Sequence, residues 1–370
     1  MRLDQVEVRQ IRLPLKAPFE TSFARTTTKE FVLVSVSADG VTGHGECIAD
    51  ADPFYLPETN ATVLHVLRDF LVPMTFALDI AHPRQVRPAL ARVRGHEMAK
   101  AALEMAVWEL VARREGVPLY RLLGGRGGEV EAGVSVGLKA DDAAVVAHVA
   151  AEVEAGYRRI KVKIKPGRDR GLVAAIRQSF PRVPLMVDAN SAYTLATAER
   201  LRALDGFSLT MIEQPLAWDD LVDHATLQRH LRTPICLDES IVSPESARRA
   251  LEIKACRVVN IKVGRVGGFT GAIGVHDVCR AQGVPVWCGG MLESGIGRLA
   301  NVHLQTLPGF TLPGDTSASG RVYEEDLVDP PVVVSPEGTI GVPEGPGIGH
   351  EILWPRVERA TTYREAWRRP

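Results

Sequence analysis

An α/β architecture is predicted for this chain: a modified (β/α)8 TIM-type barrel with an α+β capping domain formed by the N-terminal part and the C-terminal tail. Three observations favour it. The chain has 370 residues, more than one ordinary core of about 150 residues requires. Short β-rich segments alternate with helical stretches through its middle. A strand-rich and then helical opening precedes that region, and a Pro- and Gly-rich ending follows it.

Composition limits the classes of function. Lys plus Arg is 44, Asp plus Glu is 45, the net charge is -1, and 6% of residues are aromatic. These values argue against nucleic acid as a partner, because phosphate binding needs excess cations and base stacking needs aromatic rings. No apolar run reaches the roughly 18 residues that cross a bilayer, and MRLDQVEVRQ lacks the apolar stretch of a signal peptide. A cytoplasmic protein without a membrane partner is expected.

The cysteines predict neither a disulfide framework nor a zinc site, since their number is odd and no C-x-x-C spacing occurs. We expect them to be small buried side chains. They are Cys47, Cys236, Cys256, Cys279 and Cys288.

The first elements belong to the predicted capping domain, residues 1–125. β-forming residues predict strands within residues 3–15 and 30–49, and the Asp39-Gly40 pair predicts a hairpin turn between two runs. Apolar residues spaced by three and four then predict helices within residues 58–73 and 96–116.

The barrel is predicted over residues 126–324. Alternating strands and helices imply parallel pairing with right-handed crossovers, and eight such units close into a ring. The eighth segment is weak, so an irregular closure is left open. The final segment, residues 325–370, is expected to return to the capping domain. The eight strand segments are residues 130–137, 157–164, 183–189, 208–215, 233–240, 257–264, 284–290 and 310–315.

Charged residues end five of these strands at a regular interval. They are separated by 25, 25, 25 and 24 residues, the length of one βα unit. We therefore expect them at one level of the C-terminal mouth, where active sites of this architecture lie. They are Lys163, Asp188, Glu213, Asp238 and Lys262.

The three adjacent carboxylates of this set favour a bound divalent cation. A hard ion with oxygen ligands would neutralise them, and Mg2+ keeps positions for water and substrate, with Mn2+ or another divalent ion as a substitute. Each carboxylate alone could instead cap a helix. The lysines on either side favour removal of a proton next to a substrate carboxylate, through an enediolate. Strand alternation gives Lys161 the same facing as Lys163.

Longer strings make the set recognisable. RIKVKIKPG, VDANSAYTL, IEQPLAWDDLVDH, TPICLDESIVS, VNIKVGRVGG, PVWCGGMLESGIGR and LPGDTSAS resemble the o-succinylbenzoate synthase / N-succinylamino acid racemase family. This family lies in the muconate-lactonizing-enzyme subgroup of the enolase superfamily, and the likeness covers essentially the whole chain. One departure stands out: after T-S-F the family usually has Gly, whereas Ala24 is followed here by Arg25. That loop shapes the specificity pocket.

The resemblance implies a role for each site residue. Asp188, Glu213 and Asp238 would bind Mg2+, and Lys163 and Lys262 would be the acid/base pair. An arginine at position 265 is usual in relatives with racemase activity, and Arg265 would tune the proton affinity of Lys262, unless it is merely a surface arginine. The implied substrate-binding residues are Lys161, Ser135, Asn190, Met291, Glu293, Phe19, Phe23 and Tyr55.

The resemblance also implies the reactions. They are racemisation of N-succinylamino acids by 1,1-proton transfer and syn-dehydration to o-succinylbenzoate on the route to menaquinone, with both activities expected. The alternatives are a dipeptide epimerase or a muconate cycloisomerase, although the D-x-D-type motif of dipeptide epimerases is absent from LPGDTSAS. A homo-oligomer, dimer or octamer, is expected.

Overall fold

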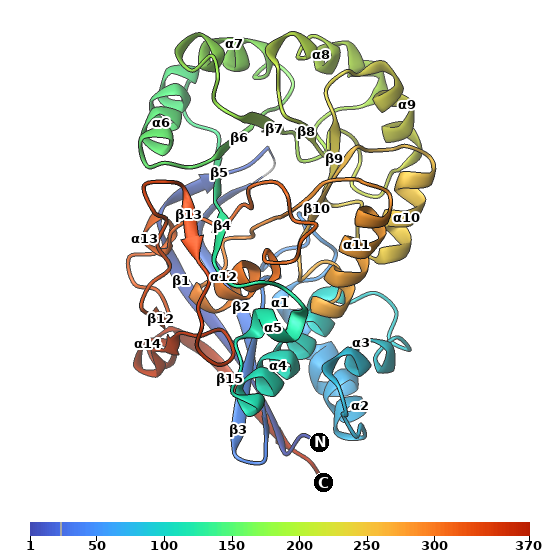
Figure 1. Cartoon of the computed structure of the whole chain (residues 1–370), viewed down its shortest axis with the longest axis vertical. Helices are drawn as coiled ribbons and strands as arrows, with labels where there is room; N and C mark the ends of the chain where they lie inside the picture. The colour runs from blue at the N-terminus through green and yellow to red at the C-terminus, as the bar shows by residue number, and fades with distance from the viewer. Residues whose placement is uncertain (23) are drawn as a thin grey trace.

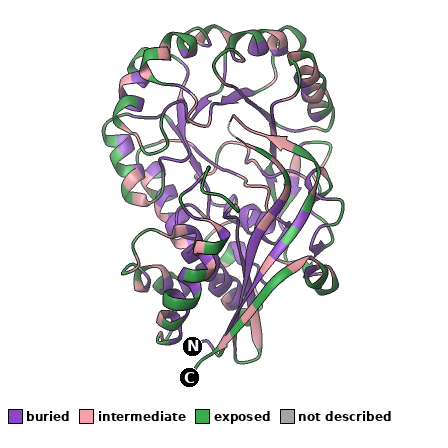
Figure 2. Ribbon diagram, turned by 180° about the vertical axis from the view of Figure 1, so that it is seen from behind, coloured by how far each residue is buried: buried purple, intermediate pink, exposed green. Residues whose placement is uncertain are grey.

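The computed structural model describes residues 1–22 and 24–370, so the predicted substrate contact Phe23 lies outside the described residues. A long antiparallel sheet with helices against it forms one end of the molecule, and a curled parallel sheet ringed by helices forms the other (Figure 1). Both termini lie at the end of the capping sheet farthest from the barrel (Figure 1). Buried residues fill the strands of the parallel sheet, and exposed residues lie on the outer sides of its helices (Figure 2).

The capping sheet joins the two ends of the chain. Its order is β15-β1-β2-β3 with antiparallel neighbours, and Val6 of β1 pairs with Trp367 of β15. Asp39 and Gly40 form the predicted turn between β2 and β3, with φ of 52° and 80°. The strands are β1 (Gln5–Glu20), β2 (Arg25–Ala38), β3 (Val41–Cys47) and β15 (Thr361–Arg368).

Helix α4 (Glu97–Glu115) packs directly on β3 because two glycines allow close approach. A Cβ atom at Gly43 would lie 2.2 Å from the backbone nitrogen of Leu110, and one at Gly45 would lie 2.1 Å from the carbonyl oxygen of Ala102. The other helices here are α1 (Asn60–Val66), the π-helix η1 (Leu67–Leu71), α2 (Val72–Phe76), the 3-10 turn η2 (Pro83–Gln85), α3 (Val86–Ala89) and α5 (Leu119–Leu123).

The barrel sheet has seven strands in the order β11-β10-β9-β8-β7-β6-β5, all parallel. The strands are β5 (Gly133–Val136), β6 (Arg159–Lys163), β7 (Leu185–Asp188), β8 (Ile212–Glu213), β9 (Ile235–Leu237), β10 (Val258–Ile261) and β11 (Val286–Cys288). The outer helices are α6 (Asp142–Glu154), α7 (Arg170–Ser179), α8 (Ala198–Arg202), α9 (Val222–His230), α10 (Pro244–Glu252), α11 (Phe269–Ala281) and α12 (Gly295–Leu304), with 3-10 turns η3 (Leu195–Thr197) and η4 (Asp205–Phe207).

The eighth predicted strand, residues 310–315, is replaced by two isolated bridges. Phe310 bridges to Val286 in β11, and Gly314 bridges to Ala132 immediately before β5. Proline donates no backbone hydrogen bond, so Pro313 weakens this segment as a ladder strand. The modified barrel is confirmed, with seven regular strands and an irregular closing segment.

The C-terminal segment contacts the capping part, where the sequence predicts its return, and also the start of the barrel. It pairs β13 with β4 at the start of the barrel, β15 joins the edge of the capping sheet, and Glu358 of α14 forms an ion pair with Arg9 of β1. The predicted first barrel strand is thereby divided into β4 and β5. The boundaries near residues 125 and 325 stay predictions. The remaining elements are β4 (Glu129–Glu131), α13 (Ser319–Val322), β12 (Val328–Asp329), β13 (Thr339–Gly341), β14 (Glu351–Ile352) and α14 (Trp354–Ala360).

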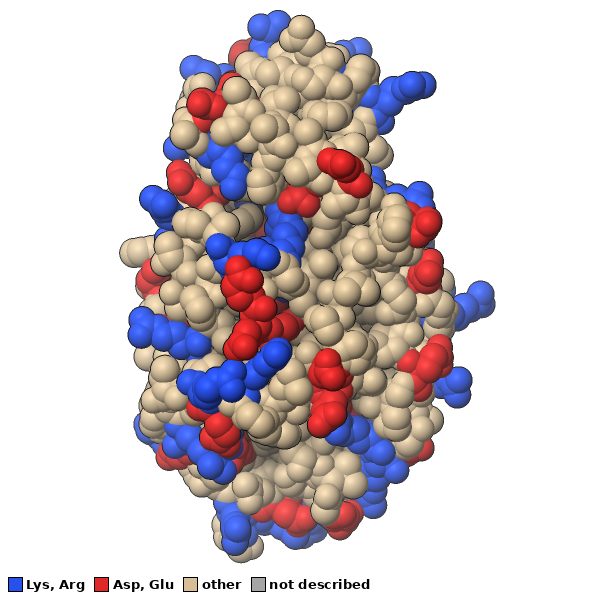
Figure 3. Space-filling model, turned by 90° about the vertical axis from the view of Figure 1, so that its left-hand side faces the viewer, with Lys and Arg blue, Asp and Glu red and all other residues tan. Residues whose placement is uncertain are grey.

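Surface and thiol features agree with the composition. All five cysteines are buried and unpaired, as expected. Acidic and basic side chains are interspersed on the face drawn in Figure 3. Within the described part of the chain, no helix combines the length and apolarity that crossing a membrane requires.

Buried carboxylates of the capping part hold two barrel helices. Glu104 of α4 accepts hydrogen bonds from the backbone N–H groups of Phe269 (2.8 Å) and Thr270 (2.9 Å), at the first turn of α11. Glu46 of β3 does the same for Ser294 (2.9 Å), at the start of α12. Since unpaired N–H groups at a helix start favour a negative charge, these contacts fix the capping part against the barrel.

Two buried histidines predict loss of stability in acid. His44 is 6% exposed and His303 is 0% exposed; burial lowers their pKa values to about 3 and about 4, with Arg113 adding to the effect at His44. The unfolded chain binds a proton at each below pH 6.5 while the folded chain does not, so stability falls as the pH falls from 6.5. At pH 5 each histidine is expected to cost about 2 kcal/mol.

Urea unfolding at pH 7.5 and pH 5 measures this effect. His44→Gln and His303→Asn should each reduce the difference between the two pH values, and His65→Gln, an exposed control, should not. An undiminished pH dependence in both buried variants would show that these histidines are not its source.

Candidate active site

Three charged residues of the predicted series lie side by side. Parallel pairing aligns Lys163 with Asp188 and Asp188 with Glu213 across β6, β7 and β8. Asp238 and Lys262 each follow the last residue of their strands, β9 and β10. All five therefore lie at the carboxyl edge of the parallel sheet, as the spacing predicts.

The Lys163 ammonium group is held by two oxygens. It donates to Asp188 Oδ2 (2.6 Å) and to Asn190 Oδ1 (2.7 Å). Asn190 has a left-handed backbone with φ of 40°, and its amide donates to Glu239 Oε1 (3.1 Å). The ammonium group thus has a fixed position at the mouth of the barrel.

Lys262 is held from the other side by a capping-loop tyrosine. Its ammonium group donates to Tyr55 Oη and to Asp238 Oδ2 (2.9 Å), and it lies 4.7 Å from the centroid of the tyrosine ring. Tyr55 Oη also donates to Asp238 Oδ2 (3.0 Å). The capping part therefore completes the surroundings of this lysine.

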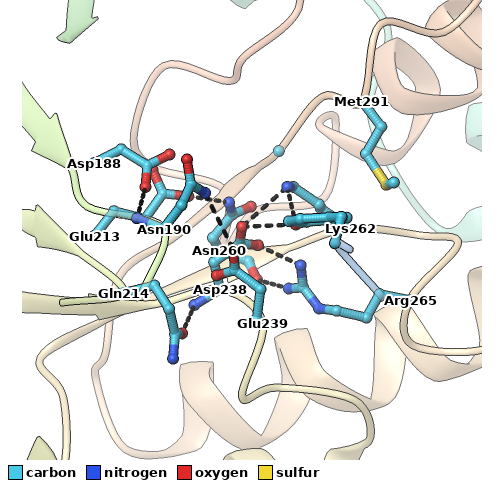
Figure 4. A network of polar contacts seen from close by, with 12 residues as sticks. Asp188, Asn190, Glu213, Gln214, Asp238, Glu239, Asn260, Lys262, Arg265 and Met291 are labelled. Atoms are coloured by element: carbon cyan, nitrogen blue, oxygen red, sulfur yellow. Dashed lines mark hydrogen bonds and ion pairs between the residues drawn. The ribbon is translucent and has the colours of Figure 1, made fainter. Parts of the chain in front are cut away.

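Arg265 is buried against Asp238. Its side chain is directed toward that carboxylate, as is Lys262 (Figure 4). It also donates to the carbonyl oxygens of Asn260 (2.9 Å) and Ile241 (2.9 Å). At 2% exposure, the alternative reading as a surface arginine is wrong. Burial alone would raise the pKa of Asp238, but the charges of Arg265 and Lys262 outweigh it and hold that pKa well below its usual range.

Lys161 lies deeper and contacts two further carboxylates. Its ammonium nitrogen is 3.0 Å from Glu213 Oε2 and 3.0 Å from Asp315 Oδ2, and it lies 4.9 Å from the centroid of the Trp287 ring. Ser135 Oγ donates to Asp315 Oδ2 (2.6 Å). Lys161 and Ser135 were predicted, whereas Asp315 was missed.

Negative charge is concentrated beneath these lysines. Glu213 is fully buried, and burial together with the charge of Asp188 raises its pKa to about 7, even with Lys161 beside it. Burial and the charge of Asp238 raise the pKa of Glu239 to about 8. Such shifts mean that ionised carboxylates here require a further cation nearby.

The donor chemistry fits a divalent cation, although each of the three carboxylates contacts a lysine ammonium group in this structure. Within the described residues, no group of three or more His, Cys, Asp or Glu side chains is arranged to enclose a metal ion. The three predicted ligands offer oxygen atoms alone, from adjacent strands, which suits a hard ion such as Mg2+. Each lies beside an ammonium group: Lys163–Asp188 at 2.6 Å, Lys161–Glu213 at 3.0 Å and Lys262–Asp238 at 2.9 Å.

A cavity of about 410 Å³ lies above the lysines, between the capping loops and the barrel mouth. The three predicted metal ligands are not among its lining residues and lie beneath the lysine layer. Every described residue predicted to bind substrate lines it: Phe19, Tyr55, Ser135, Lys161, Asn190, Met291 and Glu293.

Glu293 has a structural contact in addition to its place in the cavity wall. Its Oε1 accepts from the backbone N–H of Met291 (2.9 Å) and from the Asn301 amide (3.0 Å). It therefore holds the loop that carries Met291, which lies apart from the polar network (Figure 4).

Three polar residues of the site were not predicted. Asn260 donates to Glu213 Oε1 (2.8 Å), and Glu239 accepts from Asn190. Asp315 contacts Lys161. The sequence contained a signal for each of them. Asn260 lies two residues before Lys262, Glu239 follows Asp238, and Asp315 ends the eighth β-rich segment as charged residues end five of the other seven.

Known families match nearly the whole chain. Residues 4–124 match the family described as the mandelate racemase / muconate lactonizing enzyme N-terminal domain. Residues 144–356 match the family described as enolase C-terminal domain-like.

Individual relatives are similar over their full lengths. An o-succinylbenzoate synthase of Geobacillus kaustophilus is 52% identical over 370 residues, covering 100% of this chain and 98% of the relative. An N-succinylamino acid racemase of Thermus thermophilus is 46% identical over 364 residues, covering 98% of each. A crystal structure of an enolase superfamily member from Listeria innocua superposes with a TM-score of 0.97 at 37% identity, covering 100% of both chains.

Proposed function

Because the chain belongs to the mandelate racemase / muconate lactonizing enzyme family of the enolase superfamily, we propose that it acts on two related substrates. It racemises N-succinylamino acids and dehydrates a cyclohexadiene carboxylate to o-succinylbenzoate. The observation that carries this proposal is the placement of Lys163 and Lys262 four strands apart, each ordered by a carboxylate, facing one cavity.

Asp188, Glu213 and Asp238 would hold the metal, which we propose to be Mg2+, with Mn2+ or another divalent ion as a substitute. When bound, the metal supplies positive charge that stabilises the developing negative charge of the substrate carboxylate. We further propose a cytoplasmic homo-oligomer, dimer or octamer, from the same resemblance.

Lys163 and Lys262 have different roles in the two reactions. In racemisation one lysine removes the α-proton to give an enediolate, and the other delivers a proton to the opposite face of the same carbon. In the dehydration Lys163 removes the α-proton and then donates it to the departing hydroxyl oxygen on the same face, so that water leaves. Lys262 keeps its proton there and stabilises the ring through its positive charge. Its contacts with Tyr55 and Asp238 fix that charge in place.

Proton exchange in D2O tests this function. With Mg2+ present, the α-proton signal of an N-succinyl-L-amino acid should disappear from the NMR spectrum as the D-enantiomer forms. EDTA should stop the exchange, and added Mg2+ should restore it. Absence of metal-dependent exchange, together with absence of o-succinylbenzoate formation, would refute the proposal. Exchange on dipeptides or turnover of muconate alone would favour the epimerase or cycloisomerase reading.

A further inference from the structure

The two proposed substrates share a succinyl group, whose terminal carboxylate is separate from the one beside the reacting carbon. The first carboxylate belongs with the metal and the lysines of the barrel mouth. The second must be desolvated in the cavity and needs a cation or several hydrogen-bond donors of its own. The inference below rests on the proposed function and concerns where that second carboxylate binds.

Two cations near the mouth are already paired with acidic neighbours. The ammonium group of Lys29 contacts Asp50, and Arg12 Nε lies 3.0 Å from Glu30 Oε1. Lys29 and Arg12 both line the cavity, but each of their charges is paired with a neighbouring carboxylate. Neither offers an uncompensated charge to a ligand.

Two further arginines of the cavity wall are held by the barrel. Arg321 pairs with Glu152 (2.6 Å) and donates to the carbonyl oxygen of Ser135 (2.8 Å). Arg298 donates to the carbonyl oxygen of Glu293 (2.8 Å) and to Ser317 Oγ (3.2 Å). Their guanidinium groups therefore hold the wall together.

Arg25 differs from these four cations, each of which forms a side-chain hydrogen bond or an ion pair within the protein. It lines the cavity at the start of β2 and is exposed, and its side chain makes no hydrogen bond or ion pair with any other described residue. Its cross-strand neighbour Glu20 is paired with it in register, but their charged groups form no ion pair. A row of threonines, Thr26 to Thr28, continues the same wall and supplies hydroxyl donors.

We propose that Arg25 binds the terminal carboxylate of the succinyl group and so selects substrates that carry an acidic acyl chain. A planar guanidinium can donate two parallel hydrogen bonds to a carboxylate, which favours it over an amide or a methyl group at the same place. Arg25 is thus a specificity residue on the capping part, outside the lysines and carboxylates that handle the proton.

The test compares two acyl groups of equal length. Racemisation of N-succinyl-L-phenylalanine is measured against N-butyryl-L-phenylalanine, in which a methyl group replaces the terminal carboxylate. The wild type should prefer the succinyl substrate, and Arg25→Met should lower the ratio of the two kcat/KM values about 10-fold, mainly through KM. Arg25→Lys should retain part of the preference. Arg12→Met removes the same charge from the same wall, but from a residue paired with Glu30, and should leave the ratio unchanged.

Direct binding separates this inference from the proposed function. Titration of the Mg2+-loaded protein with N-succinylglycine and N-butyrylglycine gives the same preference without turnover. Turnover without any effect of Arg25→Met on the ratio would overturn the inference alone, as would an equal effect of Arg12→Met. A binding preference lost in Arg25→Met, but with no racemisation or dehydration, would support the inference and overturn the function. Binding of neither ligand would overturn both.

Discussion

Replacement of Lys163 by methionine is expected to reduce the rate of both proposed reactions by about 10³-fold or more, because a positioned acid/base group contributes on that order. In this structure the Lys163 ammonium group faces the cavity and is fixed by Asp188 and Asn190. Methionine preserves much of the apolar stem and removes the group that carries the proton. Initial rates of racemisation and of o-succinylbenzoate formation measure the loss.

Lys262→Met tests more directly which lysine serves which face of the substrate, because it removes the acid/base group from one face only. Racemisation should stop, yet Lys163 can still exchange the α-proton of the enantiomer that faces it. In D2O one enantiomer should therefore exchange without inversion, and Lys163→Met should give the reverse pattern. Lys165→Met, two residues after Lys163 and outside the cavity lining, is the matched control and should change neither rate. Loss of exchange for both enantiomers in both single variants would contradict the assignment of one lysine to each face.

The site was predictable to the extent that it follows from parallel pairing. Lys163, Asp188 and Glu213 end successive strands, and the parallel register places the ends of neighbouring strands together. The spacing of 25 residues therefore predicted that these side chains lie next to one another at the mouth of the barrel. The same argument extended to Asp238 and Lys262, which follow the ends of their strands.

Contacts between the capping part and the barrel could not be predicted in the same way. Tyr55 reaches Lys262 across the chain, and Glu104 caps α11 from a helix that precedes the barrel. No periodicity encodes either contact, because each depends on how two separately formed parts dock. The pairing of β13 with β4 also depends on long-range packing, although both segments look like ordinary strands or turns locally.

The burial of Asp238 against Arg265 shows a second limit of sequence reasoning. The glycine-rich sequence around Arg265 favours an exposed arginine. Only the resemblance to the family suggested that Arg265 affects the proton affinity of Lys262. The structure places the guanidinium under the loop, where it donates to Asp238 and to two backbone carbonyls. Buried charges persist where a partner compensates the loss of water. That partner, Asp238, lies at the end of the neighbouring strand, 27 residues before Arg265 in the sequence.

The buried carboxylates that are proposed to bind the metal are expected to destabilise the metal-free protein when they are ionised. The effect is clearest for Glu213. Its pKa is raised to about 7 by burial and by the charge of Asp188. A carboxyl group with a pKa above its unfolded value stabilises the fold at low pH and loses that contribution as the pH rises through the folded pKa. Above pH 7, in the absence of a divalent ion, ionised Glu213 therefore opposes folding.

Glu213→Gln is accordingly expected to have opposite effects on the metal-free and the metal-loaded protein. The amide has the same shape and no charge, so at pH 8 in EDTA the variant should melt a few degrees above the wild type. Asn260 can accommodate the amide, because its Oδ1 has no hydrogen-bond partner among the described residues and can accept from it after the Asn260 amide turns. Added Mg2+ should raise the Tm of the wild type and leave that of the variant nearly unchanged, with proton exchange lost.

Thermal unfolding across a Mg2+ titration decides between the possible roles of this carboxylate. Glu104→Gln is the control, since Glu104 is a buried carboxylate that caps α11 away from the barrel mouth, and its substitution should preserve the Mg2+-dependent rise in Tm. An equal rise in Glu213→Gln and the wild type would remove Glu213 from the proposed metal ligands. A lower Tm of Glu213→Gln in EDTA would show that the contact with Lys161 at 3.0 Å outweighs repulsion by Asp188. A carboxylate placed to bind a cation should show both effects, a higher Tm of the metal-free variant and a lost response to Mg2+. The ionised group that is repelled by Asp188 and destabilises the metal-free protein is also the group that attracts the ion.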